Sequence, residues 1–243
     1  MRLNEAKKQI EAVWQALAGL QFKSPVVSVY NPLEYARKAY DNYWRRYAGS
    51  PREIVLLGMN PGPWGMVQTG IPFGDVQMVR HWLEIDTPVQ VPAKQHPKRP
   101  VQGLDCPRSE VSGRRLWGWA KERFQTPDRF FERFWVANYC PLAFMESSGR
   151  NRTPDKLPKA EKQPLFEICD QALRLTIEAM QPNYVIGIGS FAAQRAKAAL
   201  KGMNLRLGQI THPSPANPRA NRGWASYIEA ELEAMGISLA TPV

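Results

Sequence analysis

The segment Ile54-Val55-Leu56-Leu57-Gly58 is a short, continuous apolar run that ends in a glycine. A run without alternation of polar and apolar residues is typical of a strand buried on both faces. Three later segments are similar, the last of them more weakly: 134–137, 184–188 and 205–211. Helical patterns lie between or after these strands, near residues 75–85, 113–124, 160–180, 190–201 and 220–235. Strands that alternate with helices predict an α/β fold with a central four-stranded, mostly parallel sheet and helices on both faces.

The first fifty residues are expected to form a helical part that packs on this sheet. Apolar residues recur at helical spacing over 5–20, and Asn31 and Pro32 begin a second predicted helix that runs to Tyr47. The second helix carries a stripe of aromatic residues, which predicts core packing rather than a base-stacking surface: Tyr40, Tyr43, Trp44 and Tyr47. Because no repeat or linker interrupts the chain, we expect one domain over residues 1–243.

The composition is that of a globular protein with an excess of basic residues. A hydrophobic share of 44% excludes a disordered chain, and no apolar run approaches the ~20 residues of a membrane span. The N-terminus lacks the apolar core of a secretory signal, so an intracellular protein is expected. The formal net charge is +10, and basic residues gather in 94–115 and in 179–228, which has no acidic residue. This segregation is typical of a phosphate-binding surface, although a solvated basic surface gives the same pattern.

The sequence carries no signature of a bound cofactor or metal ion, and none is expected. Cys106, Cys140 and Cys169 are too few for a disulfide framework and form no CxxC pair, so we expect buried or unreactive thiols. The stretch Gly187-Ile188-Gly189-Ser190 imitates a dinucleotide-binding fingerprint, but no acidic residue follows before Glu229 to bind a ribose. We interpret it as a tight turn between a strand and a helix.

Three candidate site residues stand just after predicted strands. Asn60 follows the first strand, Asn138 the second and His212 the fourth. Ligands of parallel sheets bind beyond the carboxyl ends of the strands, so these three side chains should converge. Each alone could be structural, as a turn cap, a partner for buried backbone or a packed histidine. Their loops are rich in proline and glycine, which hold a polar group in place at low entropic cost.

Several motifs resemble those of the single-strand-selective monofunctional uracil-DNA glycosylases, within the uracil-DNA glycosylase superfamily. The main ones are Gly58-Met59-Asn60-Pro61-Gly62-Pro63, Gln68-Thr69-Gly70-Ile71-Pro72-Phe73-Gly74 and His212-Pro213-Ser214-Pro215-Ala216-Asn217-Pro218. Shorter matches follow the same order through 96–100, 106–107, 110–113, 148–151 and 221–224. The resemblance covers most of residues 50–235 and is to a bacterial-type member. It implies a uracil-DNA glycosylase-like fold and a base excision repair enzyme for uracil and some modified or deaminated bases in DNA.

The resemblance assigns catalysis to Asn60 and His212. Asn60 would position the attacking water, and His212 would donate a hydrogen bond to uracil O2 as negative charge develops there. The chemistry is consistent with these residue types, because a stabilised leaving base and an oxocarbenium-like sugar need only a weak, well-placed nucleophile. No lysine stands in the proposed pocket segments to form a Schiff base, so the product would be an abasic site in an uncut strand.

The resemblance also implies contacts with the flipped base and with DNA. Phe73 would stack on the base, Asn138 would pair with its polar edge, the Met59 backbone would contact it, and Gly62 would leave space near C5. The residues expected to bind DNA are Gly149, Arg150, Ser214, Pro215, Ala216, Asn217, Arg219 and Arg222. Ala216 departs from the family pattern, which often has an arginine there, so wedging into duplex DNA is in doubt.

Three other polar residues need an interpretation. Asp75 is expected to cap the helix that follows Gly74, with a general-base role as the alternative. His81 is expected to be exposed on that helix. His96 lies in the basic, proline-rich loop, where contact with phosphate or solvent is expected rather than catalysis.

Two other function classes stay open at this point. A non-catalytic single-stranded nucleic-acid-binding protein would use the same basic surface and aromatic residues. A nucleoside hydrolase is disfavoured because a small substrate does not need segregated basic segments. The expected partner is uracil-containing DNA, single- or double-stranded, with no membrane and a monomeric protein. It would act in the cytoplasm at the nucleoid in a bacterium, or in the nucleus of a eukaryote.

Overall fold

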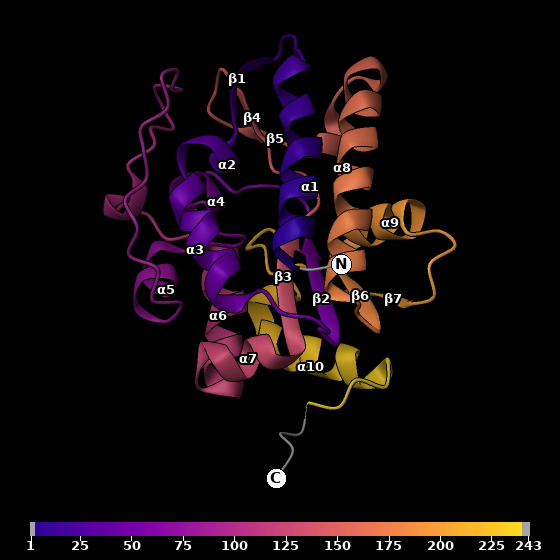
Figure 1. Cartoon of the computed structure of the whole chain (residues 1–243). Coiled ribbons are helices and arrows are strands. Elements are labelled where there is room, and N and C mark those ends of the chain that lie inside the picture. The colour runs from indigo at the N-terminus through magenta and orange to yellow at the C-terminus, as the bar shows by residue number, and fades with distance from the viewer. Residues whose placement is uncertain (1–2, 240–243) are drawn as a thin grey trace.

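Strand β2 (Ile54–Gly58) lies in the interior of the central sheet, and all five of its residues are buried. It pairs in parallel with β3 (Phe134–Asn138) on one side and with β6 (Tyr184–Ile188) on the other, and β7 (Arg206–Ile210) pairs with β6. The computed structural model describes residues 3–239 and contains the predicted four-stranded sheet in the order β3-β2-β6-β7 (Figure 1). Every pairing in this sheet is parallel, so the predicted fold class is confirmed.

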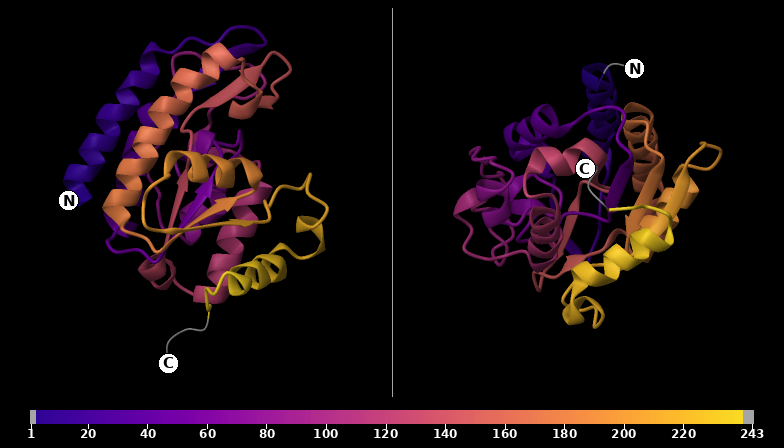
Figure 2. Two further views of the ribbon diagram at one scale, coloured as in Figure 1. Left: turned by 90° about the vertical axis from the view of Figure 1, so that its right-hand side faces the viewer. Right: turned by 90° about the horizontal axis from the view of Figure 1, so that it is seen from below.

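Helices cover both faces of this sheet. On one face, α1 (Leu3–Gln15) lies alongside α8 (Lys159–Met180), and α9 (Ser190–Ala199) packs against β6 (Figure 2). On the other face, α6 (Val111–Phe124) contacts α7 and α10. The remaining helices are α2 (Pro32–Tyr35), α3 (Arg37–Tyr47), α4 (Met66–Thr69), α5 (Val76–His81), α7 (Pro127–Arg133) and α10 (Trp224–Ala234), with 3-10 turns at Ala16–Gly19, Gly103–Asp105, Pro154–Lys156 and Ala220–Arg222. Within residues 3–239, no helix is both long enough and apolar enough to cross a membrane.

The expectation that the first fifty residues are entirely helical is wrong. Strand β1 (Val26–Tyr30) pairs antiparallel with β4 (Ala143–Glu146), and β4 pairs with β5 (Asn151–Arg152). These strands form a second sheet in the order β1-β4-β5. The sequence did not reveal them because β1 finds its partner far away in the chain. Residues 1–2 and 240–243 of the predicted domain lie outside the described residues.

Several helix boundaries also differ from the prediction. The helix expected over 32–47 is interrupted at Ala36, which separates α2 from α3. The helix expected over 75–85 ends at His81, and Glu84 beyond it has a positive φ of 50°. Helix α7 was not predicted, although Thr126 caps it by accepting a hydrogen bond from the backbone N–H of Arg129 and proline occupies its first position.

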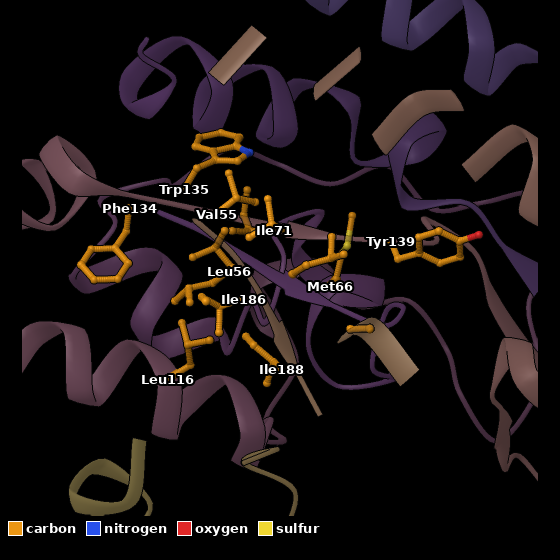
Figure 3. Close-up of a cluster of buried hydrophobic side chains, with 14 of the residues drawn as sticks. Val55, Leu56, Met66, Ile71, Leu116, Phe134, Trp135, Tyr139, Ile186 and Ile188 are labelled. Atoms are coloured by element: carbon orange, nitrogen blue, oxygen red, sulfur yellow. The ribbon is translucent and has the colours of Figure 1, made fainter. Parts of the chain in front are cut away.

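The aromatic stripe of α3 is core packing, as predicted. Tyr40, Tyr43, Trp44 and Tyr47 are all buried. The hydroxyl of Tyr43 donates to the carbonyl of Val136 at 2.9 Å, and its ring lies 4.7 Å from that of Trp135. Figure 3 shows the sheet core that these aromatic residues adjoin, with Val55 and Trp135 toward one face and Leu56, Leu116 and Ile186 toward the other.

The cysteines and the Gly187–Ser190 segment also have the predicted structural roles. Cys106, Cys140 and Cys169 are free and buried. Gly189 has a φ of 85°, in the left-handed region that favours glycine, and α9 begins directly after it. Gly187 lies so close to α9 that a Cβ added there would collide with the backbone of Ala192 and Ala193. The segment is therefore a tight turn that packs α9 on β6.

We predict that Gly187→Ala lowers the free energy of unfolding by about 1–3 kcal/mol, because the added methyl group meets rigid backbone. Urea denaturation followed by circular dichroism would measure this change.

Gly118→Ala is the matched control. Gly118 lies inside α6 with open space around the added methyl group, so this change should raise the free energy of unfolding by about 0.5–1 kcal/mol. Equal stability of the two variants would contradict the close packing of α9 on β6.

Candidate active site

A single cavity at the carboxyl ends of β2, β3 and β7 brings together the residues that the sequence singled out. Its lining is Met59, Asn60, Gly62, Met66, Phe73, Glu110, Ser112, Asn138, Thr153 and His212. All six residues predicted to act on the base are in this set. The register of the sheet explains the convergence, because Gly58 at the end of β2 stands opposite Asn138 at the end of β3. The predicted convergence of Asn60, Asn138 and His212 is confirmed.

The side chain of Asn60 is held in one orientation by the backbone. Its Nδ2 donates to the carbonyl of Leu142 at 3.0 Å. The neighbouring residues are fixed as well, since the Met59 carbonyl accepts from Cys140 N at 2.9 Å and the Pro61 carbonyl accepts from Asn151 Nδ2 at 3.0 Å. Among residues 3–239, no protein group donates to the Asn60 Oδ1 atom. This oxygen is therefore free to accept a hydrogen bond from a water molecule or ligand.

His212 presents a neutral ring with a defined tautomer. The backbone N–H of Ser214 donates to His212 Nδ1 at 3.0 Å, so in the neutral ring the proton resides on Nε2. Burial of the ring lowers its pKa below the ordinary value, which favours this neutral form. Gly189 packs against the ring, since a Cβ there would lie 3.2 Å from His212 Cβ. The cavity thus contains an oriented N–H donor.

Phe73 adopts a backbone conformation that its neighbours impose. Its φ of 54° lies in the left-handed region, which is uncommon for an aromatic residue. Gly113, in the first turn of α6, packs so closely on the Phe73 carbonyl that an added Cβ would collide with it. At Gly58 an added Cβ would lie 2.6 Å from the Phe73 ring. Two glycines therefore make room for Phe73, whose ring centroid is 6.4 Å from that of His212.

Asn138 offers an amide that the protein leaves largely available. Its Nδ2 lies 3.3 Å from the sulfur of Met66, which is a weak acceptor. Its Oδ1 packs against Gly58, where any side chain would collide with it. Both halves of the amide are thus positioned by close packing rather than by strong hydrogen bonds. A ligand can therefore compete for them.

Four lining residues carried no predicted role: Met66, Glu110, Ser112 and Thr153. The most notable is Glu110, a half-buried residue whose carboxylate fills the space beside Gly62 and Gly65. An added Cβ at Gly65 would lie 2.8 Å from Glu110 Cγ, and one at Gly62 would collide with the carboxylate. Burial raises the pKa of Glu110, while hydrogen bonds from the backbone of Ser112 and Trp64 lower it in part. The segment Glu110–Gly113 matched the family pattern, but the match did not indicate what the carboxylate does.

Asp75 is a helix cap, as predicted. Its Oδ1 accepts from Met78 N at 3.3 Å, and its Oδ2 accepts from Ser109 Oγ at 2.7 Å and from Glu110 N at 3.0 Å. Asp75 is buried and does not line the cavity. These contacts occupy both carboxylate oxygens, which disfavours a role as a general base.

The two other histidines lie outside the cavity. His81 is exposed, as predicted. The expectation that His96 contacts phosphate or solvent is wrong, because only 2% of the residue is exposed. Its backbone N–H donates to the Tyr30 hydroxyl at 2.7 Å, and its Nδ1 accepts from Lys98 N at 3.1 Å. His96 therefore orders its own loop.

Residues 212–222 form a loop, called the 212–222 loop below. Hydrogen bonds to α6 and between its own residues hold this loop in place. Arg115 donates to the Pro213 carbonyl and to Asn221 Oδ1, both at 2.9 Å. Asn221 Nδ2 in turn donates to the Pro215 carbonyl at 2.9 Å. Further local bonds involve Ser214, Ala216, Asn217 and Arg219. The predicted DNA-binding residues that are exposed are Arg150, Pro215, Ala216, Arg219 and Arg222, whereas Gly149 is buried, with a φ of 83°, and Ser214 and Asn217 are half-buried.

Within the described part of the chain, no group of three or more His, Cys, Asp or Glu side chains could hold a metal ion.

Comparisons with known proteins agree with these features. The family model described as uracil DNA glycosylase superfamily matches residues 47–232. A protein of Mus musculus named single-strand selective monofunctional uracil DNA glycosylase is 45% identical over 223 residues, which cover 91% of this chain and 80% of the relative. Its namesake from Bos taurus is 42% identical over 239 residues, or 98% of this chain and 84% of the relative. These relatives are mammalian and do not support the expected bacterial type.

A solved structure is similar in fold. The crystal structure of wild-type Pedobacter heparinus SMUG2 superposes with a TM-score of 0.63 at 17% sequence identity, covering 89% of this chain and 90% of that chain. At this level of identity the likeness concerns the fold alone.

We predict that His212 titrates below 6.5, the ordinary pKa of histidine, and that its neutral ring carries the proton on Nε2. Because the unfolded chain then binds a proton more readily than the folded chain, this group should destabilise the fold as pH falls below 6.5. Nitrogen-15 NMR of the imidazole rings would measure the midpoint and the tautomer.

A His212 midpoint at or above 6.5, or a proton on Nδ1 in the neutral ring, would contradict the arrangement.

Proposed function

The chain belongs to the uracil DNA glycosylase superfamily, and we propose that it hydrolyses the N-glycosidic bond of uracil in DNA at the cavity between Asn60, Asn138 and His212. Its curated relatives, 42% to 46% identical, are named as monofunctional uracil DNA glycosylases. The observation that carries the proposal is the neutral His212, whose ring carries its proton on Nε2 and lines the same cavity as Asn60. The reaction releases the free base and leaves an abasic site.

His212 stabilises the leaving base. Breaking the glycosidic bond leaves negative charge on the uracil ring, part of it on O2. A hydrogen-bond donor that is already oriented in a buried pocket stabilises this charge without reorganisation. Because the pKa of His212 is lowered, the ring acts as a neutral donor rather than as an acid that gives up its proton.

Asn60 positions the nucleophile. Its Nδ2 is engaged with the Leu142 carbonyl, so Oδ1 accepts a hydrogen bond from the attacking water. An amide oxygen is a weak base, but the sugar that departs from the base resembles an oxocarbenium ion and reacts with a weakly activated water. Neither step requires a carboxylate base, which is consistent with Asp75 being occupied as a helix cap.

Phe73 and Asn138 select the base. The ring of Phe73 stacks on the flipped pyrimidine, and the Met59 backbone contacts its edge. Asn138 donates from Nδ2 to O4 of uracil and accepts from N3–H at Oδ1. Cytosine presents the opposite pattern, with an acceptor at N3 and a donor at the 4-position, so the same amide disfavours it. The Glu110 carboxylate stands beside Gly62, and the gap for C5 substituents that we expected at this glycine stays a prediction.

We propose that the partner is uracil-containing DNA, and that the protein binds it in both single-stranded and double-stranded form. Arg150, Arg219 and Arg222 bind phosphates, and the 212–222 loop supports the strand from which the base has flipped. None of the described residues that line the cavity is a lysine, so the enzyme hydrolyses the bond without cutting the strand. We further propose that the chain works as one domain and as a monomer, inside the cell, at the nucleoid or in the nucleus.

We predict that Asn60→Ala and His212→Ala each reduce the rate of uracil release from a single-stranded oligonucleotide by about 10²–10³-fold, because each removes one oriented polar group from the transition state. The rate would be measured under single-turnover conditions with EDTA present. His81→Ala, which removes an exposed histidine, is the control and should leave the rate unchanged.

The same experiment separates catalysis from binding. Binding of the oligonucleotide by the unaltered protein with no release of base would favour a single-stranded nucleic-acid-binding protein and reject the proposed hydrolysis.

A second prediction concerns base selection by Asn138. Asn138→Asp should shift preference from uracil toward cytosine, because a protonated carboxyl group can accept from the 4-amino group and donate to N3. Release of both bases from otherwise identical oligonucleotides would be compared. Unchanged preference would remove Asn138 from this role.

A further inference from the structure

Trp64 is contacted by two arginines at the rim of the cavity. The guanidinium carbon of Arg99 lies 4.9 Å from the centre of the indole ring, and that of Arg108 lies 4.8 Å from it. The cluster adjoins the candidate site, because Trp64 follows Asn60 in the same loop and its backbone hydrogen-bonds the Glu110 carboxylate. We call these three residues the Arg–Trp–Arg cluster.

The positive charge of the Arg–Trp–Arg cluster has no acidic partner. Among residues 3–239, neither Arg99 nor Arg108 forms an ion pair with a carboxylate. Arg99 donates from Nη1 to the Lys98 carbonyl, and its buried Nε has no partner. By contrast, Arg152 and Arg195 are paired with Glu146 and Asp170. The two guanidinium groups are therefore not neutralised by an ion pair and are available to an anionic ligand.

Gln68, whose side chain is fully buried, joins the two loops that carry Trp64 and Arg99. Gln68 Nε2 donates to the carbonyls of Pro63 and Pro100, both at 3.0 Å, and its Oε1 accepts from Gln102 N at 2.8 Å. Pro63 and Pro100 are the chain neighbours of Trp64 and Arg99. The Tyr30 hydroxyl also donates to the Arg99 carbonyl at 2.6 Å. The loops that carry Trp64 and Arg99 are thus joined to each other without a ligand.

The chemistry of the cluster fits phosphate. A guanidinium that stacks on an indole keeps its N–H edge free for bidentate bonds to phosphate oxygens. The distances place the two guanidinium carbons within about 10 Å of each other, a span that suits nearby phosphates of one DNA strand. Gly149 packs on Lys98 and Arg99, which places its neighbour Arg150 beside the cluster. Lys98 and Arg150 are both exposed. Because the two guanidinium groups already lie against the indole ring of Trp64, we do not expect a DNA base to stack on that ring.

We propose that the Arg–Trp–Arg cluster binds phosphates of the DNA strand that carries the target uracil, as a contact surface separate from the 212–222 loop. This inference rests on the proposed function. Its role is to hold the strand next to the cavity, so it acts on substrate binding and not on the chemical step. None of its three residues lines the cavity.

The test compares two double variants with the unaltered protein. Arg99→Ala with Arg108→Ala removes two charges from the cluster. Arg129→Ala with Lys201→Ala removes two charges from exposed positions near the opposite edge of the sheet, since α7 leads into the start of β3 and Lys201 precedes β7. Uracil release from a single-stranded oligonucleotide would be followed over a range of salt concentrations.

The cluster variant should raise KM about tenfold with kcat unchanged, and should reduce the slope of log affinity against log salt by about 1.4, or 0.7 for each phosphate contact on single strands. The control variant should change neither quantity. Arg99→Lys with Arg108→Lys should restore the salt slope but only part of the affinity, because lysine keeps the charge without the stacked, bidentate geometry. Circular dichroism verifies that each variant is folded.

Replacing single phosphates of the oligonucleotide by uncharged methylphosphonates locates the contact. The unaltered protein should lose affinity at one or two positions to which the cluster variant is insensitive. An equal KM and salt slope for the cluster and control variants would overturn the proposal while uracil release itself persists. Failure of the unaltered protein to release uracil would instead reject the proposed function. In that case the cluster would be tested by comparing the affinity of the cluster and control variants for uracil-free DNA.

Discussion

Parallel pairing on both sides of β2 is the constraint on which the rest of the structure depends. In a parallel sheet all carboxyl ends lie at one edge, and the backbone hydrogen bonds leave no freedom to move one end relative to its neighbours. Gly58 therefore meets Asn138, and Ile188 meets Ile210 two residues before His212. The cavity is a consequence of this register, because the strands place residues from separate parts of the chain at the same edge. The strands are buried and cannot slide without exposing their apolar side chains.

The site relies on neutral polar groups that the backbone orients. Leu142 fixes the amide of Asn60, and Ser214 fixes the tautomer of His212. Such groups need no counterion in a buried pocket, so the cost of burying charge is avoided. The exception is Glu110, a half-buried acidic residue whose raised pKa reflects the cost of removing its carboxylate from water. The positive charge lies outside the cavity, on exposed arginines and on the Arg–Trp–Arg cluster, where it can act on phosphates without disturbing the leaving base.

Local patterns predicted much of the fold and the main site residues, and missed what depends on distant partners. The apolar runs identified β2, β3, β6 and β7, and the proline and glycine motifs identified Asn60 and His212. Strand β1 was taken as part of a helical segment because its pairing with β4 lies more than a hundred residues away. His96 was placed in a solvent-exposed basic loop, yet it is buried and its backbone N–H donates to Tyr30 of that same strand. Both errors have one origin, the second sheet.

The amino-acid sequence by itself determined the four strands of the parallel sheet and which polar side chains stand at their carboxyl ends. These follow from hydrophobic patterning and turn chemistry, which act over a few neighbouring residues. Only the tertiary structure decided that Glu110 fills the space at Gly62, that His212 carries its proton on Nε2, and that Gln68 joins the loops of Trp64 and Arg99. The reason is physical: each depends on close packing or on a hydrogen bond between specific atoms of the folded chain, and a one-dimensional pattern does not encode the distances between them.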